Sequence, residues 1–258
     1  MASNIFTIDR VSFSYGDAPL FSDFSLTLPE GKVTTLIGAN GSGKSTLFDL
    51  MTKNLKPRSG SIFLRGGDVA ALRLRDFAKL VAIVHQRNIA PADLSVEKLV
   101  SYGRFPYRTF GHAGNGEEDE AMVNWALSVC ELDGCRHQSV SSLSGGQAQR
   151  VWIALALAQG SKVLLLDEPT TYLDVRYQLD ILRLVRRLNE EFAMTVIMVL
   201  HDINQALHYS DEVVALEGGR LIAQGAPTDI VSEELLAEVY GIPLRVVEVD
   251  GKPFVLEV

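Results

Sequence analysis

Cysteine is scarce in this 258-residue sequence, which contains Cys130, Cys135 and no other. The two do not form a Cys-x-x-Cys motif, and no histidine cluster accompanies them. The sequence therefore predicts neither a zinc site nor a disulfide framework, and we expect two reduced thiols, either buried or free.

Long apolar runs are also missing. No stretch approaches the roughly 18 consecutive apolar residues that a membrane-spanning helix needs. The first ten residues, MASNIFTIDR, lack the apolar core of a signal peptide. The sequence therefore predicts a soluble, cytoplasmic chain that reaches a membrane only through partner proteins.

Positive charge is in short supply as well. The 24 lysines and arginines are outnumbered by 32 aspartates and glutamates, which gives a formal net charge of −8. That balance argues against a nucleic-acid-binding protein with a broad basic face. The hydrophobic content of 47% is that of an ordinary folded protein, and the length allows one large domain or a core with an inserted subdomain.

Apolar patterning predicts an α/β fold. Alternating apolar and polar residues at 4–15 and 20–28 indicate half-buried antiparallel strands. Other strands are expected at 32–38, 60–66, 80–86, 162–169 and 194–202. Helices are expected at about 44–53, at 175–192, and after the strand 194–202, ending at about residue 208. Hairpins are expected at 212–225 and around Asp250-Gly251. Continuous apolar strands alternating with helices are typical of a mainly parallel sheet.

The region 87–158 has a different character, with helical pieces, a loop at 110–120 and no convincing strand. We predict a single domain, 1–258. Its core comprises 1–86 and 159–258, with an antiparallel β subdomain, and 87–158 is an inserted helical subdomain.

A glycine-rich segment carries the first recognisable chemistry. GANGSGKST, at 38–46, fits G-x-x-x-x-G-K-[ST] and lies between a predicted strand and a predicted helix. Its glycines let backbone amides face phosphate oxygens, Lys44 supplies positive charge, and Ser45 offers a hydroxyl to Mg²⁺. The residues expected at the phosphates are Gly38, Asn40, Gly41, Ser42, Gly43, Lys44, Ser45 and Thr46. This loop alone does not choose among kinases, GTPases and ATPases.

Three polar residues follow buried runs elsewhere. Asp167 ends the strand in LLLDEP, where its carboxylate can face the Mg²⁺ held by Ser45. Glu168 stands just beyond, where it can orient or deprotonate an attacking water. His201 follows TVIMVL, which a parallel sheet delivers to the same edge, so we expect it to contact the γ-phosphate.

The segment LSGGQ, at 143–147, begins a predicted helix in an unusual way. Ser144 is a good N-cap, and Gln147 completes a capping box. Gly145 and Gly146 each give up about 1 kcal/mol of helix propensity relative to alanine, and the capping box does not explain them. A bare backbone at a helix N-terminus favours the close approach of an anion.

The P-loop, Gln86, LSGGQ, LLLDEP, YLD and LHD occur in that order, and together they resemble the ATP-binding subunit of ABC transporters over essentially the whole chain. The resemblance implies a P-loop NTPase fold of the RecA-like kind. It also implies an ATPase coupled to transmembrane transport, with ATP and Mg²⁺ as cofactors.

The resemblance also assigns roles to individual positions. Tyr15 would stack on adenine, and Gln86 would contact Mg²⁺ or the lytic water and sense the membrane subunits. Asp174, in YLD, would cross a dimer interface. In this family two copies pack head to tail, so the LSGGQ of one copy, including Ser144, would cover the nucleotide held by the other.

Further partners follow from the same resemblance. They are transmembrane permease subunits and, indirectly, an extracellular or periplasmic substrate-binding protein, with no nucleic acid. The expected location is the cytoplasmic face of the membrane, peripheral through the permease.

A finer resemblance concerns the branch of the family. The segments GRFPY (103–107), RVWIALALAQ (150–159), PTTYLD (169–174), LHDINQALHYSD (200–211) and AQGAP (223–227) resemble importers of iron(III)-siderophores, haem or cobalamin. Iron(III)-siderophore import is our main hypothesis. The alternatives are a haem or cobalamin importer, an exporter cassette, a soluble ABC ATPase of DNA repair or translation, and a nucleotide-dependent scaffold without turnover.

Overall fold

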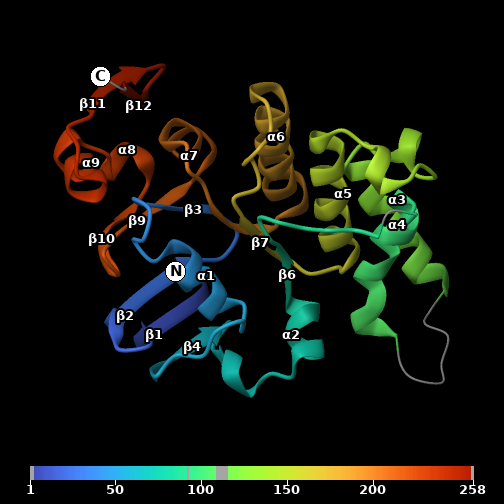
Figure 1. Cartoon of the computed structure of the whole chain (residues 1–258), viewed down its shortest axis with the longest axis horizontal. Coiled ribbons are helices and arrows are strands. Elements are labelled where there is room, and N and C mark those ends of the chain that lie inside the picture. Colours follow the sequence, from blue (N-terminus) through green and yellow to red (C-terminus); the bar gives the residue numbers. More distant parts are fainter. Residues whose placement is uncertain (1–2, 92, 109–115, 257–258) are drawn as a thin grey trace. The chain divides into compact units, whose positions relative to one another are not determined.

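The computed structural model describes residues 3–91, 93–108 and 116–256. It divides into two compact units, one formed by 1–72 and 189–258 and the other by 73–188. Figure 1 shows the elements of both units, which are taken in turn below. In the described ranges, no helix is both long and apolar enough to cross a membrane.

The first unit contains an antiparallel sheet with the strand order β2-β1-β4-β5. The strands are β1 (Asn4–Tyr15), β2 (Ala18–Pro29), β4 (Ser59–Leu64) and β5 (Gly67–Asp68). The register places Phe6 opposite both Leu28 and Leu64, and all three side chains are buried. The predicted strands at 4–15 and 20–28 are thus confirmed, since alternation delivers one apolar face to this core.

The same unit contains three parallel strands, and an antiparallel strand follows the last of them. β3 (Val33–Ile37) lies between β8 (Thr195–Val199) and β9 (Glu212–Glu217), and β9 turns into β10 (Arg220–Gly225). Every residue of β3 and β8 is buried, which accounts for their nearly continuous apolar character. The helix α1 (Lys44–Met51) follows β3, and α7 (Ile203–Tyr209) follows β8.

The short turn η1 (Val69–Ala71) follows β5. The C-terminal part of this unit contains two helices after β10, namely α8 (Pro227–Ile230) and α9 (Glu233–Tyr240). It ends in the hairpin of β11 (Arg245–Val249) and β12 (Lys252–Leu256), which turns at Asp250-Gly251 as predicted. Asn204 of α7 fastens this hairpin, because its amide both donates to and accepts from the Val255 backbone, at 3.0 and 2.7 Å.

The second unit pairs two parallel strands and contains most of the helices. The strands β6 (Val81–Val84) and β7 (Val163–Asp167) are aligned from Val81 opposite Val163 onward. The helical elements are α2 (Leu74–Leu80), α3 (Val96–Ser101), η2 (Tyr102–Tyr107), α4 (Gly116–Val129), η3 (Asp133–Cys135), η4 (Val140–Ser142), α5 (Gly145–Ala158) and α6 (Val175–Phe192).

The helices α3, α4 and α5 pack against one another, as the green and yellow ribbons of Figure 1 show. Arg104 of η2 is 3% exposed and holds this group together. Its Nε donates to Asp119 of α4 at 2.7 Å, and its Nη1 donates to the Ala158 carbonyl at the end of α5 at 3.0 Å. A buried arginine is tolerated here because both of these donors are satisfied.

Most sequence expectations for the second unit are confirmed, with one correction. The helix at 175–192 has the predicted bounds, and Ile181, Val185 and Leu188 are buried on one face. The loop predicted at 110–120 is wrong at its end, since residues 116–120 form the first turn of α4, where three acidic side chains favour a helix start. The rest of that loop, 110–115, lies outside the described residues.

The two cysteines are free and buried, as expected. Burial raises the pKa of the Cys130 thiol to about 12, so it stays protonated and unreactive. The predicted subdomain boundaries at 87 and 158 stay a prediction; the compact unit 73–188 also includes α2, β6, β7 and most of α6.

Candidate functional site

The glycine-rich loop of the first unit folds tightly at the end of β3. Gly38 has φ +150°, and a Cβ there would lie 2.3 Å from the Leu216 carbonyl oxygen. Gly43, at the start of α1, has φ +107°, and a Cβ there would lie 2.8 Å from the Phe21 ring. Only glycine fits both positions, so the loop can bring bare backbone amides to the N-terminus of α1.

Lys44 lies inside this loop with 5% of its surface exposed. Its ammonium donates to the carbonyls of Gly38 and Ala39 at 2.7 and 3.0 Å, so the side chain holds the loop in shape. The Ser42 hydroxyl is buried and has no hydrogen-bond partner within the described residues. A buried cation beside an unsatisfied hydroxyl is a setting in which phosphate oxygens can supply the missing contacts.

Tyr15 and Thr46 lie at the side of the same loop. The Tyr15 hydroxyl and the Thr46 hydroxyl are 3.2 Å apart, and the Tyr15 ring, 56% exposed, meets the Phe13 ring edge-on at 5.0 Å. A fixed and exposed aromatic face can stack on a planar base. Asn40, Gly41 and Ser45 are exposed around the loop.

His201 follows β8 by two residues and is exposed at the start of α7. Asp202 beside it caps that helix by accepting from the Gln205 amide at 2.9 Å. Tyr240 of α9 joins this region to the loop, since its hydroxyl is hydrogen-bonded to the Gly38 backbone and lies within the electrostatic influence of Asp202. Burial raises the pKa of Tyr240 to about 12, so the phenol stays neutral there.

In the second unit, Gln86 and Glu168 form a direct pair. The Gln86 amide, two residues after β6, donates to Glu168 Oε2, and the Thr171 hydroxyl donates to the same oxygen at 3.2 Å. Glu168 follows Asp167 at the end of β7 and has φ +49°. A left-handed glutamate is uncommon, and such strain concentrates at functional sites.

A second contact links the neighbouring residues of these two segments. The hydrogen bond to Tyr172 raises the pKa of Arg87, and Tyr172 is itself left-handed, with φ +66° and 78% exposure. Asp174 then caps α6, because its side chain accepts from the Tyr177 amide at 3.1 Å. The Arg87–Tyr172 hydrogen bond therefore joins the segment after β6, which contains Gln86, to the segment before α6, which contains Asp174.

The helix α5 begins with the predicted capping box. The Ser144 hydroxyl accepts from the Gln147 amide at 3.3 Å, and the Gln147 side chain accepts from the Ser144 amide at 3.1 Å. The two glycines differ. Gly146 is buried, and a Cβ there would lie 2.3 Å from the Tyr177 ring, whereas a Cβ at the exposed Gly145 would meet only Leu173, at 3.4 Å. Packing within the chain explains Gly146 and leaves Gly145 unexplained.

Gly146→Ala is therefore expected to lower the free energy of unfolding by about 1–3 kcal/mol, the usual range for overpacking. Gly145→Ala is the matched control. It leaves the fold at least as stable as the parent, because helix propensity rises by about 1 kcal/mol. Denaturant unfolding of both variants measures the difference, and equal effects would contradict the role given to Tyr177.

Sequence reasoning missed several of these residues. Tyr240, Arg87 and Tyr177 belong to no motif that names their role, and their contacts arise only when the chain folds. Thr171 lies in PTTYLD, but that segment does not predict its bond to Glu168. For Tyr172, its place in PTTYLD marked the segment but not its bond to Arg87.

Comparison with known proteins agrees with this chemistry. A family model described as "ABC transporter" matches residues 21–171. The petrobactin import ATP-binding protein FpuC of Bacillus anthracis is 43% identical over 248 residues, which cover 96% of this chain and 91% of that protein.

Another relative is the iron(3+)-hydroxamate import ATP-binding protein FhuC of Bacillus subtilis, 41% identical over 95% of this chain and 90% of that protein. Among solved structures, cbiO1 from Clostridium perfringens, part of the ABC transporter complex cbiONQ, superposes with a TM-score of 0.80. It is 30% identical and covers 91% of this chain and 93% of its own. The predicted P-loop NTPase fold is thereby confirmed.

Proposed function

This chain belongs to the ABC transporter family of ATP-binding proteins, and from that premise we propose that it is the ATP-hydrolysing subunit of an importer for iron(III)-siderophores. The observation that carries the proposal is a sequence identity above 40%, over nearly the full length, to two import ATP-binding proteins, one of them named for iron(3+)-hydroxamate. Haem and cobalamin are the alternative cargoes.

ATP binding is assigned to the glycine-rich loop of the first unit. Amides of 38–46 and the ammonium of Lys44 would bind the β- and γ-phosphates, with the Ser42 hydroxyl as a further contact. Tyr15 would stack on the adenine, and His201 would contact the γ-phosphate. A triphosphate would compete with the Gly38 and Ala39 carbonyls for the Lys44 ammonium.

Mg²⁺ fits the donor chemistry of the chain. Across the described ranges no group of three or more His, Cys, Asp or Glu side chains could hold a metal ion without help. Mg²⁺ is commonly held through one or two carboxylates together with substrate phosphates. The exposed Ser45 hydroxyl, the Asp167 carboxylate and the Gln86 amide oxygen would be its ligands, and the ion would offset phosphate charge when bound with ATP.

Hydrolysis needs a water aligned with the γ-phosphate. Glu168 would orient that water or take its proton, and the Gln86 amide holds this carboxylate in place before the water arrives. Lys44 and His201 would balance charge as it develops on the phosphoryl oxygens.

Cassettes of this family act as dimers with permease subunits. We place the second copy head to tail, with Ser144, Gly145 and Gln147 of one copy over the nucleotide of the other. The exposed backbone of Gly145 suits that approach, since no side chain in the described part of its own chain requires a glycine there. Asp174 would lie at the same interface.

We assign the permease contact to a groove of the second unit. Residues 86–89 of the segment after β6 and one side of α5, including Trp152, line a groove of about 350 Å³. Ile89 at this groove is 92% exposed, which is unusual for a large apolar side chain. A permease segment in the groove would reach Gln86 directly, and would place this chain at the cytoplasmic face of a membrane. A substrate-binding protein outside would deliver the cargo.

Uptake of radiolabelled iron tests the cargo. A strain that lacks this gene is expected to lose uptake of iron(III) bound to a siderophore, and the parent gene restores it while the Glu168→Gln gene does not. Haem and cobalamin uptake, measured in parallel, should be unchanged. Loss of either in place of siderophore iron would move the assignment to that cargo, and no loss at all would reject import.

A further inference from the structure

Two short segments of the second unit are paired through residues that the proposed chemistry does not use. We call residues 94–97 and 136–140 the clasp. Val96 N–H donates to the Gln138 carbonyl at 3.0 Å, Glu97 N–H to the Arg136 carbonyl at 2.9 Å, and Val140 N–H to the Leu94 carbonyl at 3.0 Å. These backbone bonds join the N-terminus of α3 to the segment that precedes α5.

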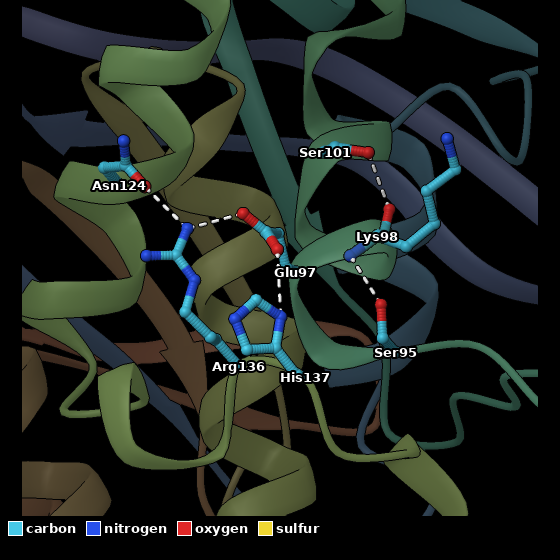
Figure 2. A network of polar contacts seen from close by, with 7 residues as sticks. All are labelled: Ser95, Glu97, Lys98, Ser101, Asn124, Arg136 and His137. Carbon is cyan, nitrogen blue, oxygen red and sulfur yellow. Dashed lines mark hydrogen bonds and ion pairs between the residues drawn. The ribbon is translucent and has the colours of Figure 1, made fainter.

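Side chains reinforce the clasp, as Figure 2 shows. Glu97 Oε1 accepts from Arg136 Nη2 at 2.5 Å, and Glu97 Oε2 lies 3.4 Å from His137 Nδ1. The same Arg136 Nη2 donates to Asn124 of α4 at 2.8 Å. One carboxylate therefore bonds two neighbouring residues of the facing segment, and one guanidinium connects that segment to a second helix.

Within this network, the Glu97–Arg136 ion pair is the more shielded part, since the His137 side chain is 80% exposed. The side chains of Glu97 and Arg136 are 38% and 29% exposed, so the pair is partly shielded from water. Arg136 Nε is buried and has no hydrogen-bond partner within the described residues. The guanidinium is consequently held through Nη2, and removal of the Glu97 charge replaces a charge-assisted hydrogen bond by a weaker neutral one, next to the neutral oxygen of Asn124.

The position of the clasp along the chain connects two parts of the proposed site. Gln86 precedes the first clasp segment by eight residues, and Ser144 follows the second by four. Between Val140 and Ser144 the chain forms the short turn η4, so little slack separates the clasp from the N-cap of α5. The clasp therefore ties residues 94–97 to the segment that leads into α5.

We propose that Glu97 is a positioning residue for ATP-driven dimerisation. Through Arg136 and His137, it sets the position and orientation of the Ser144–Gln147 turn. The inference rests on the proposed head-to-tail dimer and adds to it a link, within each copy, between the segment after Gln86 and the turn that covers the partner's nucleotide. Glu97 touches no nucleotide itself.

The role predicts a specific split between two measurements. ATP binding to a single copy uses the glycine-rich loop and stays within about twofold of the parent in Glu97→Gln, because a partly exposed ion pair contributes little to folding. ATP-dependent dimerisation weakens about tenfold, since a symmetric dimer uses two such turns and a loss of about threefold at each multiplies.

The test uses the full chain in a Glu168→Gln background, in which slow hydrolysis leaves the ATP-bound dimer intact during the measurement. Analytical ultracentrifugation with ATP and Mg²⁺ gives the dimer dissociation constant, and a fluorescent ATP analogue gives binding to the single copy. Glu97→Gln, Arg136→Gln and the double variant form a cycle, whose effects should be markedly less than additive. Glu97→Asp serves if Glu97→Gln folds poorly, and denaturant unfolding checks each variant.

Glu117→Gln is the matched control, because Glu117 is an exposed carboxylate in the first turn of α4 in the same unit. It should change neither constant. Unchanged dimerisation in Glu97→Gln, equal loss of ATP binding and dimerisation, or additive effects in the cycle would each overturn the inference. A Glu168→Gln parent that fails to dimerise with ATP would instead reject the proposed dimer and, with it, this inference.

Discussion

Glu168→Gln is expected to lower the rate of ATP hydrolysis by about a hundred- to a thousandfold, the usual contribution of a positioned general base. Glutamine keeps the shape of the side chain and a carbonyl oxygen that can accept from Gln86 and Thr171, as Glu168 Oε2 does. It loses the negative charge that orients and deprotonates water. ATP affinity should therefore stay near that of the parent, and a closed dimer should accumulate in the presence of ATP.

The measurement is phosphate release at saturating ATP, paired with ATP binding and sedimentation. Glu131→Gln is the matched control, because Glu131 is also a left-handed glutamate of the second unit, with φ +58°, and pairs with Arg150 at 2.6 Å. Its replacement changes a strained, charged glutamate that has no part in the proposed chemistry, and should leave the hydrolysis rate within about twofold. Parent-like hydrolysis in Glu168→Gln would remove Glu168 from the chemistry.

Much of the fold could be predicted from the sequence, because local patterns decide it. The alternation at 4–15 and the amphipathic face of 175–192 each commit one side of an element to a core, and the structure has strand and helix at these places. The end of the 110–120 loop was mispredicted because three glycines at 111–116 favour a loop, while the acidic run at 117–120 starts a helix.

The site was predictable only in part, for a physical reason. Gly38, Lys44 and Ser144 belong to contiguous motifs whose spacing carries the chemistry. Tyr240 and Gly38 are about two hundred residues apart, and no spacing rule predicts that the phenol meets the loop backbone. For Gly146 the motif suggested the close approach of an anion. The structure gives a different reason for this glycine, because a Cβ there would clash with the Tyr177 ring of the same chain.

Lys44→Met should weaken ATP binding by about a hundredfold or more, since hydrogen bonds to charged groups contribute about 1.5–3 kcal/mol each and the ammonium would make at least two to phosphate oxygens. Hydrolysis should fall with it. The variant also removes the bonds to the Gly38 and Ala39 carbonyls, so its free energy of unfolding should drop by about 1–3 kcal/mol. A loss of affinity alone could then be blamed on a disturbed fold.

Lys53→Met separates these two causes, because Lys53 belongs to the same unit and plays the same structural part. Its ammonium donates to the carbonyls of Val69 and Leu72 at 2.5 and 2.6 Å, away from the glycine-rich loop. Both variants should lose similar stability, while only Lys44→Met loses ATP, as calorimetric titration and denaturant unfolding together would measure. If the Lys44→Met and Lys53→Met variants bound ATP equally well, Lys44 would have a structural role only. The triphosphate would then have to be held by the backbone amides and the helix N-terminus alone.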